Sequence, residues 1–171
     1  MHCAQIFTIA FTPLSGNHIS FPHFTGIIKE KELWLKMIDN LLLILKPKST
    51  IVYLEEKMTL RQSLEKMRFH GYTAVPVIDE EGKYIGTVSE GDFLWHILDH
   101  KENSIYDLEK VSLKEIIRPN FNPCVKVYTP IENLAEQILN QNFVPVIDDQ
   151  GVLMGIVTRQ NVIRYLMDRK Q

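Results

Sequence analysis

The stretch Val75-Pro76-Val77-Ile78-Asp79 recurs as Val144-Pro145-Val146-Ile147-Asp148, so a constant offset, called the repeat offset, takes position 75 to position 144. The repeat offset holds well beyond these identical residues. It also relates Gly82 to Gly151, Gly86 to Gly155, Val88 to Val157, Ser89 to Thr158 and Asp92 to Asn161. One offset over so many positions indicates an internal duplication, which determines the fold more firmly than any single element.

Both copies predict the same succession of elements. Apolar residues at helical spacing run from Leu60 to Met67 and again from Ile131 to Leu139. In the first copy a buried strand from Thr73 to Ile78, a glycine turn and a second strand from Tyr84 to Val88 form a hairpin, and a helix follows from Phe93 onwards. The second copy repeats this order. The chain is therefore predicted to have an α+β fold of two tandem β-α-β-β-α units.

Residues typical of helix starts precede the predicted helices. Thr59 and Thr129 are each placed as an N-cap, whose hydroxyl accepts a hydrogen bond from a free amide of the first turn. Ser112-Leu113-Lys114-Glu115 has the pattern of a capping box and predicts a short helix between the copies. The opening strand of each unit is predicted at residues 51–53 in the first copy and at residues 125–127 in the second.

The duplication also divides the chain. The predicted parts are an N-terminal extension at residues 1–36, the first repeat at 37–100, a linker at 101–111 and the second repeat at 112–171. The extension has no counterpart in the repeat. We hypothesise that Met37 is the native start, so that the preceding residues are non-native or disordered. The alternative is a genuine extension that packs on the two repeats.

Composition excludes several classes of function. The 171 residues carry 19 basic and 21 acidic side chains, a net charge of −2, and this lack of basic excess argues against nucleic acid as a partner. The apolar run from Leu33 to Leu45 is too short to cross a bilayer and contains charged residues, so no membrane association is expected. With only two cysteines, Cys3 and Cys124, a reducing compartment such as the cytoplasm is expected.

The duplicated pattern is hydrophobic-Pro-Val-hydrophobic-Asp, a glycine turn, then Gly-hydrophobic-hydrophobic-Ser/Thr-x-x-Asp/Asn. It resembles the CBS domain, named after cystathionine beta-synthase, and the chain resembles a stand-alone, bacterial-type CBS domain pair, a Bateman module. The stretches Gly86 to Asp92 and Gly155 to Asn161 are the most specific, and the resemblance covers roughly residues 38–170. It implies repeats packed through their sheets with pseudo-twofold symmetry, and a homodimer. It also implies a regulatory adenosine-containing ligand (AMP, ADP, ATP, S-adenosylmethionine or cyclic di-AMP) but no required cofactor.

The resemblance further implies where the ligand binds. By the family pattern the acidic residue of Ser/Thr-x-x-Asp bonds the ribose hydroxyls and the hydroxyl residue lies near phosphate, which points to Ser89 and Asp92 in one cleft. Thr158 and Asn161 take these places in the other cleft, where the Arg159 guanidinium can reach a phosphate. The adenine ring is implied to lie against residues of the strand segments, namely Ile51, Tyr72, Thr73, Ala74, Pro76, Phe143, Val144 and Pro145.

Simple chemistry favours the first of these clefts. A helix N-terminus offers unpaired amides and partial positive charge to an anion. A carboxylate that accepts from two ribose hydroxyls makes charge-assisted hydrogen bonds worth roughly 1.5–3 kcal/mol each when water is excluded. Asp92 supplies such a carboxylate, whereas Asn161 does not. The sequence therefore predicts an asymmetric sensor whose better cleft is built around Asp92.

Simpler interpretations accompany these. Ser89 and Asp92 can also serve only as a helix cap. His96 and His100 are expected on a solvated helix face and not at a metal, because no third ligand is evident. No nucleophile–base motif is present, so no enzyme is predicted. The leading hypothesis is a regulatory adenine-nucleotide sensor that acts on a separate partner protein, and the alternative is a ligand-free structural or scaffolding dimer.

Overall fold

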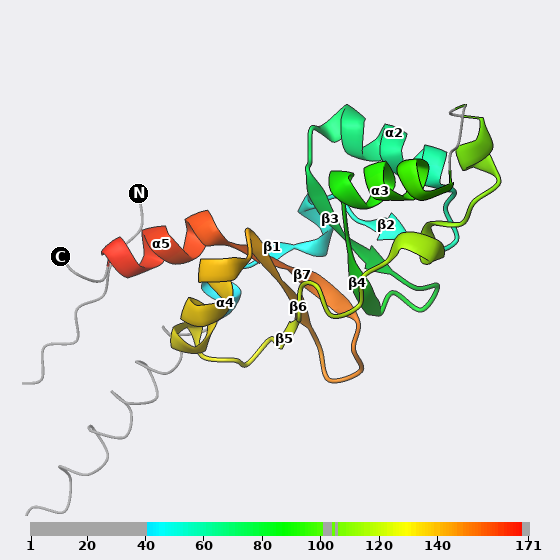
Figure 1. Cartoon of the computed structure of the whole chain (residues 1–171). Coiled ribbons are helices and arrows are strands. Elements are labelled where there is room, and N and C mark those ends of the chain that lie inside the picture. The colour runs from blue at the N-terminus through cyan, green and yellow to red at the C-terminus, as the bar shows by residue number, and fades with distance from the viewer. Residues whose placement is uncertain (1–40, 101–103, 105, 169–171) are drawn as a thin grey trace, which may run out of the picture. The chain divides into compact units, whose positions relative to one another are not determined.

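The computed structural model describes residues 41–100, 104 and 106–168, which contain one sheet in each copy of the repeat (Figure 1). The first copy consists of β2 (Leu54–Glu55), α2 (Leu60–His70), β3 (Ala74–Ile78), β4 (Tyr84–Ser89) and α3 (Glu90–His100). The second consists of β5 (Val125–Lys126), a 3-10 turn η5 (Ile131–Leu134), α4 (Ala135–Asn140), β6 (Phe143–Ile147), β7 (Leu153–Thr158) and α5 (Arg159–Asp168). The predicted tandem β-α-β-β-α fold is confirmed. The N-terminal extension and the hypothesis about Met37 lie outside the described residues.

The two sheets repeat the same pairing. The opening strand runs parallel to the first hairpin strand, β2 to β3 and β5 to β6, and the hairpin strands are antiparallel. Val77 lies opposite Gly86 in the first sheet and Val146 opposite Gly155 in the second, so the register keeps the repeat offset. Each sheet packs on its own apolar cluster, one of which includes Val77 and Phe93 and the other Val146 and Val162.

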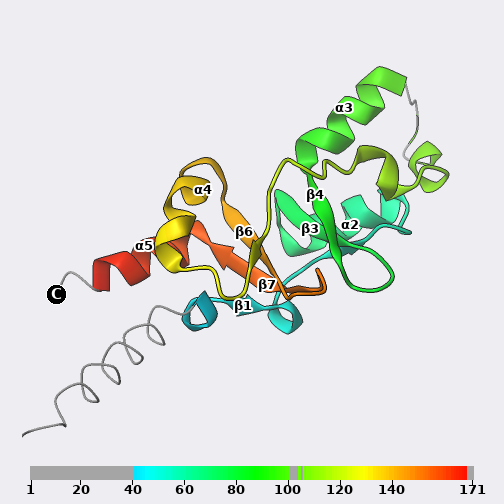
Figure 2. The ribbon, with the colours of Figure 1, turned by 90° about the horizontal axis from the view of Figure 1, so that it is seen from below.

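A short strand joins the two copies. β1 (Lys46–Pro47), which precedes β2 of the first repeat, pairs antiparallel with β7 of the second sheet, beside which it lies in both Figure 1 and Figure 2. In the matching place of the second repeat, Arg118 precedes β5 and forms a bridge to Thr87 of β4. The first segment of each repeat therefore lies on the sheet of the other. This exchange was not predicted from the sequence.

Two glycines make the exchange possible. A Cβ at Gly155 would lie 2.1 Å from the Lys46 carbonyl oxygen, and a Cβ at Gly86 would lie 2.5 Å from the Cγ2 methyl of Ile117. Real Cβ atoms do not approach other heavy atoms so closely, so a side chain at either position would push the crossing segment away. The shared glycine of the Gly-x-x-Ser/Thr pattern is thus a packing requirement of the two-repeat fold.

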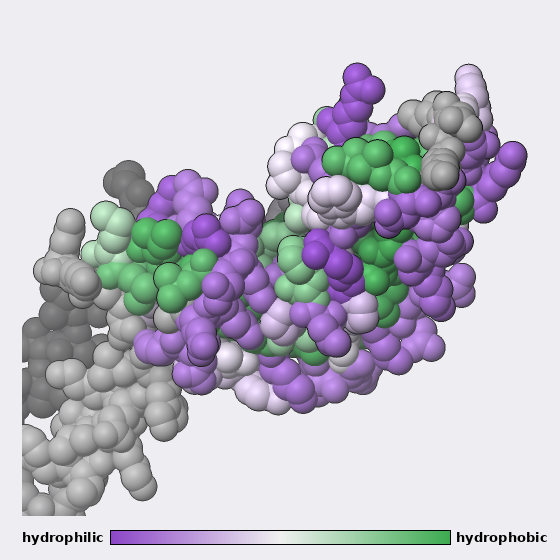
Figure 3. Space-filling model, viewed as in Figure 1, coloured by the Kyte–Doolittle hydropathy of each residue, from purple (hydrophilic) through white to green (hydrophobic). Residues whose placement is uncertain are grey.

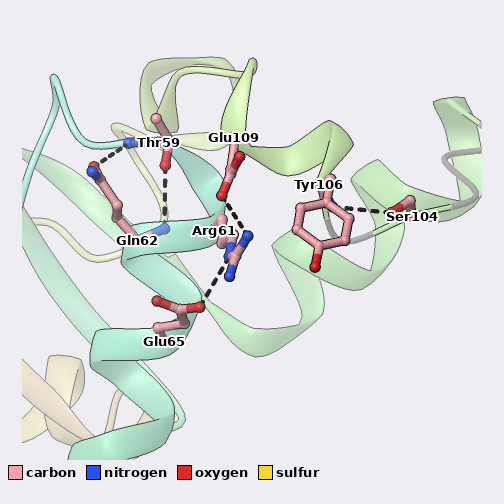
Figure 4. Close-up of polar contacts among 7 residues, drawn as sticks. All are labelled: Thr59, Arg61, Gln62, Glu65, Ser104, Tyr106 and Glu109. Atoms are coloured by element: carbon pink, nitrogen blue, oxygen red, sulfur yellow. Dashed lines mark hydrogen bonds and ion pairs between the residues drawn. The ribbon is translucent and has the colours of Figure 1, made fainter.

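The start of α2 is held by local and long-range polar contacts (Figure 4). Thr59 accepts from the amide of Gln62 and the Gln62 side chain accepts from the amide of Thr59, a complete capping box. Arg61 forms ion pairs with Glu65 in the next turn and with Glu109 in η3 (Asp107–Glu109), a 3-10 turn between the repeats. The predicted Thr59 cap is confirmed, and Arg61 fastens part of the linker to the first repeat.

Three local predictions need correction. The second repeat begins its helical region with the η5 3-10 turn, and the N-cap of α4 is Leu134, so the α-helix N-cap predicted at Thr129 is wrong. Ser112 does cap a helix, but the helix is the 3-10 turn η4 (Leu113–Ile116) and the hydroxyl accepts from Lys114. The opening strand of the first repeat is β2 and not residues 51–53, because the preceding chain is occupied by β1 and the 3-10 turn η2 (Lys48–Thr50).

A half-buried tyrosine, Tyr84, holds the connection between the repeats in place. Tyr84 on β4 donates a hydrogen bond to the carbonyl of Asn122 at 2.7 Å, and its hydroxyl lies 2.8 Å from that of Thr87. Burial raises the pKa of Tyr84 to about 12, so the phenol stays neutral at physiological pH. The segment before β5 is therefore held against the first sheet at the place where Arg118 also crosses it.

Candidate functional site

One cleft among the described residues opens beside the N-terminus of α3 and has a volume of about 310 Å³. One side is supplied by the first repeat, through Ser89, Glu90 and the buried Thr87. The other side is supplied by the second repeat, through residues 121–122 and 140–143. This α3 cleft is thus lined by both repeats and not by one alone.

The second cleft, the α5 cleft, has a volume of about 270 Å³ and is lined in part by Thr158, the residue that precedes α5. Its apolar lining consists of Ile51, Val52, Tyr72, Ala74, Val75, Pro76, Phe143 and Ile156. Lys46, Thr50 and Thr73 add polar groups to this lining. Both clefts lie near the small end of the usual range for small-molecule sites, roughly 300–1,000 Å³.

Four residues form a wall shared by the two clefts. Thr73 and Ala74 of the first repeat line both, as do Asn142 and Phe143 of the second. The repeat offset relates position 73 to position 142 and position 74 to position 143. The pseudo-twofold axis that relates the repeats therefore passes through this wall. Each cleft combines the helix start of one repeat with strand residues of the other.

At the α3 cleft, the carboxylate of Asp92 is engaged within the protein. The amide and the hydroxyl of Ser89 each donate to Oδ2 at 2.7 Å. Arg118 forms an ion pair through its Nε, 2.7 Å from Oδ1, and its Nη2 donates to Oδ2 and to the Ser89 hydroxyl at 3.1 Å. The guanidinium lies 3.4 Å from the ring centroid of Phe121. Only 9% of the Asp92 side chain is exposed, so this carboxylate is a helix cap and an ion-pair partner.

The matching position at the α5 cleft is neutral. The side chain of Asn161 donates through Nδ2 to the carbonyl of Ile44 at 2.9 Å, and the backbone amide of Asn161 donates to the hydroxyl of Thr158 at 3.3 Å. The basic residue that lies across the sheet of the other repeat is here Lys46. It pairs with Ile156 on β7, as Arg118 pairs with Thr87 on β4. The two clefts therefore differ both in the helix residue and in the basic residue that crosses beside it.

A family model for the CBS domain matches the chain twice, at residues 44–99 and 113–168. The chain belongs to the CBS domain family. Both matched ranges contain a complete hairpin followed by a helix, so the clefts described above lie between two CBS repeats.

Individual relatives agree with this assignment. The chain is 30% identical over 138 residues to the chloroplastic CBS domain-containing protein CBSX1 of Arabidopsis thaliana, in an alignment that covers 66% of the chain and 58% of CBSX1, so it spans little more than half of that relative. Its structure is similar to that of CbpB in complex with c-di-AMP, with a TM-score of 0.71, 23% identity, and coverage of 84% and 93% of the two chains. It is also similar to CBSX2 in complex with AMP, with a TM-score of 0.63, 25% identity, and coverage of 77% and 98%.

Most, but not all, of the predicted ligand residues line the CBS clefts. Those found in the lining are Ile51, Tyr72, Thr73, Ala74, Pro76, Ser89, Phe143 and Thr158. Those found outside it are Asp92, Asn161, Val144, Pro145 and Arg159. Val144 is fully buried in the core of the second repeat. The contact of each residue with a ligand stays a prediction.

Arg159 lines neither CBS cleft, but it lines an adjoining cavity of about 670 Å³ together with Asn142 and Thr158, which also line the α5 cleft. Its Nε donates to the carbonyl of Ile138 at 2.8 Å, and its Nη2 donates to that of Leu139 at 3.4 Å. These carbonyls belong to the last turn of α4, where free acceptors and partial negative charge attract a cation. The structure thus gives Arg159 a local partner that spacing along the sequence did not reveal.

Two residues important to the CBS clefts were missed from sequence. Arg118 and Lys46 each precede a proline, in Arg118-Pro119 and Lys46-Pro47, and both follow an apolar residue. The spacing between these two basic-Pro pairs is slightly larger than the repeat offset, so a search at one fixed offset overlooks them. A search that allows small insertions between copies would have found them.

The expectation for the two histidines was partly wrong. His96 is buried, at 7% exposure, and its ring stacks on that of His100 with 4.1 Å between centroids. The prediction of a solvated face therefore fails for His96. Within the described part of the chain, no three His, Cys, Asp or Glu side chains gather closely enough to hold a metal ion. In the same residues, no helix combines the length and the apolar character needed to span a bilayer.

Proposed function

We propose that this CBS pair is a regulatory module that binds an adenine nucleotide in the clefts between its repeats and signals occupancy to a separate protein. The observation that carries the proposal is that each cleft is lined by both repeats, so a ligand in either cleft touches both. Such a ligand stabilises the arrangement of the repeats that it bridges, which is how binding energy shifts a conformational equilibrium. Catalysis by this chain, for which no nucleophile–base motif was found, is not part of the proposal.

The lining chemistry supports an adenine nucleotide. In the α5 cleft, Pro76, Phe143 and the aliphatic side chains around them offer an apolar slot for a purine ring. Hydroxyls of Thr50, Thr73 and Thr158 surround this slot and can bond ribose or phosphate. Two proteins of similar structure, CbpB with c-di-AMP and CBSX2 with AMP, support the same ligand class. The candidate ligands are AMP, ADP, ATP, S-adenosylmethionine and cyclic di-AMP.

Calorimetric titration and thermal unfolding with these ligands test the proposal. We expect at least one of them to bind and to raise the melting temperature, because a ligand that binds only the folded state stabilises it by mass action. GMP at the same concentration should give a smaller effect. Thr73→Trp, which fills the wall shared by both clefts, should abolish binding, whereas Tyr128→Trp, at an exposed position outside both clefts, should not. If none of the adenine ligands binds, the scaffolding dimer becomes the better hypothesis.

We further propose that the module forms a homodimer through α3 and α5. Each helix exposes apolar side chains at corresponding positions, Leu94 and Leu98 on α3 and Ile163 and Met167 on α5. Figure 3 shows apolar atoms gathered over α3 and again around α5. Because the repeat offset relates the two faces, a second copy can bury both through one twofold axis. Exposed apolar patches of this kind typically mark interaction surfaces.

The dimer is tested by light scattering after size-exclusion chromatography. The wild-type chain is expected at twice its mass of 19.9 kDa. The double variant Leu98→Glu/Met167→Glu is expected to be monomeric, because it places two charges in the buried interface. Phe69→Glu, which changes an exposed apolar residue on α2, should leave the dimer intact. A monomeric wild-type protein, or a double variant that stays dimeric, would contradict the assignment of this surface.

A further inference from the structure

The segments that cross the two sheets place a basic residue at the same position of each sheet, and Lys46 lines its cleft whereas Arg118 does not. Lys46 lies opposite Ile156 on β7, and Arg118 lies opposite Thr87 on β4. The repeat offset takes position 87 to position 156, so the two basic residues are structural counterparts. Their surroundings decide whether the charge of each is available to a ligand.

The charge of Arg118 is already balanced. Its guanidinium contacts both oxygens of Asp92 and the hydroxyl of Ser89, and it packs on the ring of Phe121. Arg118 itself does not line the α3 cleft, and the one charged residue in the described lining is the carboxylate of Glu90. A phosphate entering this cleft would meet an acidic side chain, and the nearby arginine is already neutralised by Asp92, so the α3 cleft disfavours anions.

The charge of Lys46 has no such balance. The counterpart of Asp92 at the α5 cleft is the neutral Asn161, whose side-chain amide donates a hydrogen bond to the carbonyl of Ile44. Among the described residues, no carboxylate forms an ion pair with the Lys46 ammonium, and the lining of the α5 cleft contains no acidic side chain. Lys46 is exposed and is the one charged residue of that described lining. The α5 cleft is therefore the electropositive one.

We propose that Lys46 is the specificity-determining residue that makes the α5 cleft the site for phosphate-bearing adenine ligands, while the α3 cleft accepts uncharged nucleoside groups. The inference rests on the proposed function and adds to it which of the two clefts binds the phosphate of the ligand. It reverses the expectation from sequence, in which Asp92 marked the better cleft. The reason is that Asp92 and Arg118 neutralise each other. In the second repeat the neutral Asn161 occupies the position of Asp92, so the charge of Lys46 is not balanced.

The test compares AMP with adenosine, because the two differ only in the phosphate. In Lys46→Met the length of the side chain is nearly kept and its charge is removed. We expect AMP affinity to fall about tenfold, the usual loss for one charge-assisted contact, and adenosine affinity to stay unchanged. Lys48→Met is the matched control, because Lys48 is close in the chain, lies over the ring of Tyr53 and does not line the cleft. AMP should bind this variant as it binds the wild type.

The outcomes separate the two levels of the proposal. If the wild type binds AMP but Lys46→Met keeps the same ratio of AMP to adenosine affinity, the role of Lys46 is overturned while the nucleotide-binding function stands. Two AMP sites of equal affinity in the wild type would also overturn it. If the wild type binds no adenine ligand, the proposed function fails and this inference fails with it. Circular dichroism confirms that each variant is folded before titration.

Discussion

Replacing Gly155 with alanine is expected to lower the free energy of unfolding by about 3 kcal/mol. The added Cβ would lie 2.1 Å from the Lys46 carbonyl oxygen and 3.0 Å from the Pro47 Cα, and both belong to backbone that cannot rotate away. The lower entropy of the unfolded chain with alanine offsets this by only about 0.4–1 kcal/mol. Since β1 must separate from β7, Lys46 should also leave the α5 cleft, and AMP affinity should fall together with stability.

Urea unfolding of three glycine variants measures this effect. Gly86→Ala should cost less than Gly155→Ala, because its closest contact is a side-chain methyl of Ile117 and not backbone. Gly91→Ala is the control. It lies in the first turn of α3, its Cβ would lie no closer than 3.5 Å to any neighbour, and alanine favours a helix, so stability should rise slightly. If Gly155→Ala and Gly91→Ala have the same stability, the crossing of β1 over β7 is wrong.

The second large effect is expected at Asp92, where Asp92→Ala should cost about 2 kcal/mol of stability. The variant removes two short hydrogen bonds from Ser89, one of them from a backbone amide at the start of α3, and it leaves Arg118 without its carboxylate. The ion pair itself adds little to this figure, because 43% of the Arg118 side chain is exposed and water screens its charge. Most of the loss therefore comes from the helix start.

Asn161→Ala is the natural comparison, because it stands at the same position of the second repeat. Its side chain donates one neutral hydrogen bond to the carbonyl of Ile44, so the expected cost is about 1 kcal/mol. The two variants are compared by chemical denaturation in the absence of ligand. Equal losses at the two positions would show that the Asp92–Arg118 contact does not distinguish the repeats.

The architecture could be predicted well from the sequence because most elements occur twice, with similar residues in each copy. The β3–β4 and β6–β7 hairpins follow strand residues and turns that occur twice, and their positions were confirmed. The helical region that precedes β6 was predicted at the right residues, but its first turn is a 3-10 turn, and helical spacing alone does not separate the two helix types. The exchange of β1 escaped prediction because so short a strand has too little pattern to recognise.

The composition of the clefts was only partly predictable. Thr73 and Phe143 were expected from the family pattern, and they form part of the wall shared by the clefts. The partners of Asp92 could not be foreseen, because Arg118 lies 26 residues away and reaches it only through the crossing of the chain. A site between two repeats depends on how they pack, and sequence spacing within one repeat does not contain that information.

The central claim is that adenine nucleotide binds between the repeats, and amide NMR spectra recorded during an AMP titration test it most directly. We predict progressive shifts for the amides of Ile51, Thr73 and Thr158, which line the α5 cleft, with smaller changes at Ile163 and Met167 on the exposed face of α5. Saturation should leave the fold unchanged. Spectra that do not change with AMP, or changes confined to the exposed face of α5, would contradict the claim.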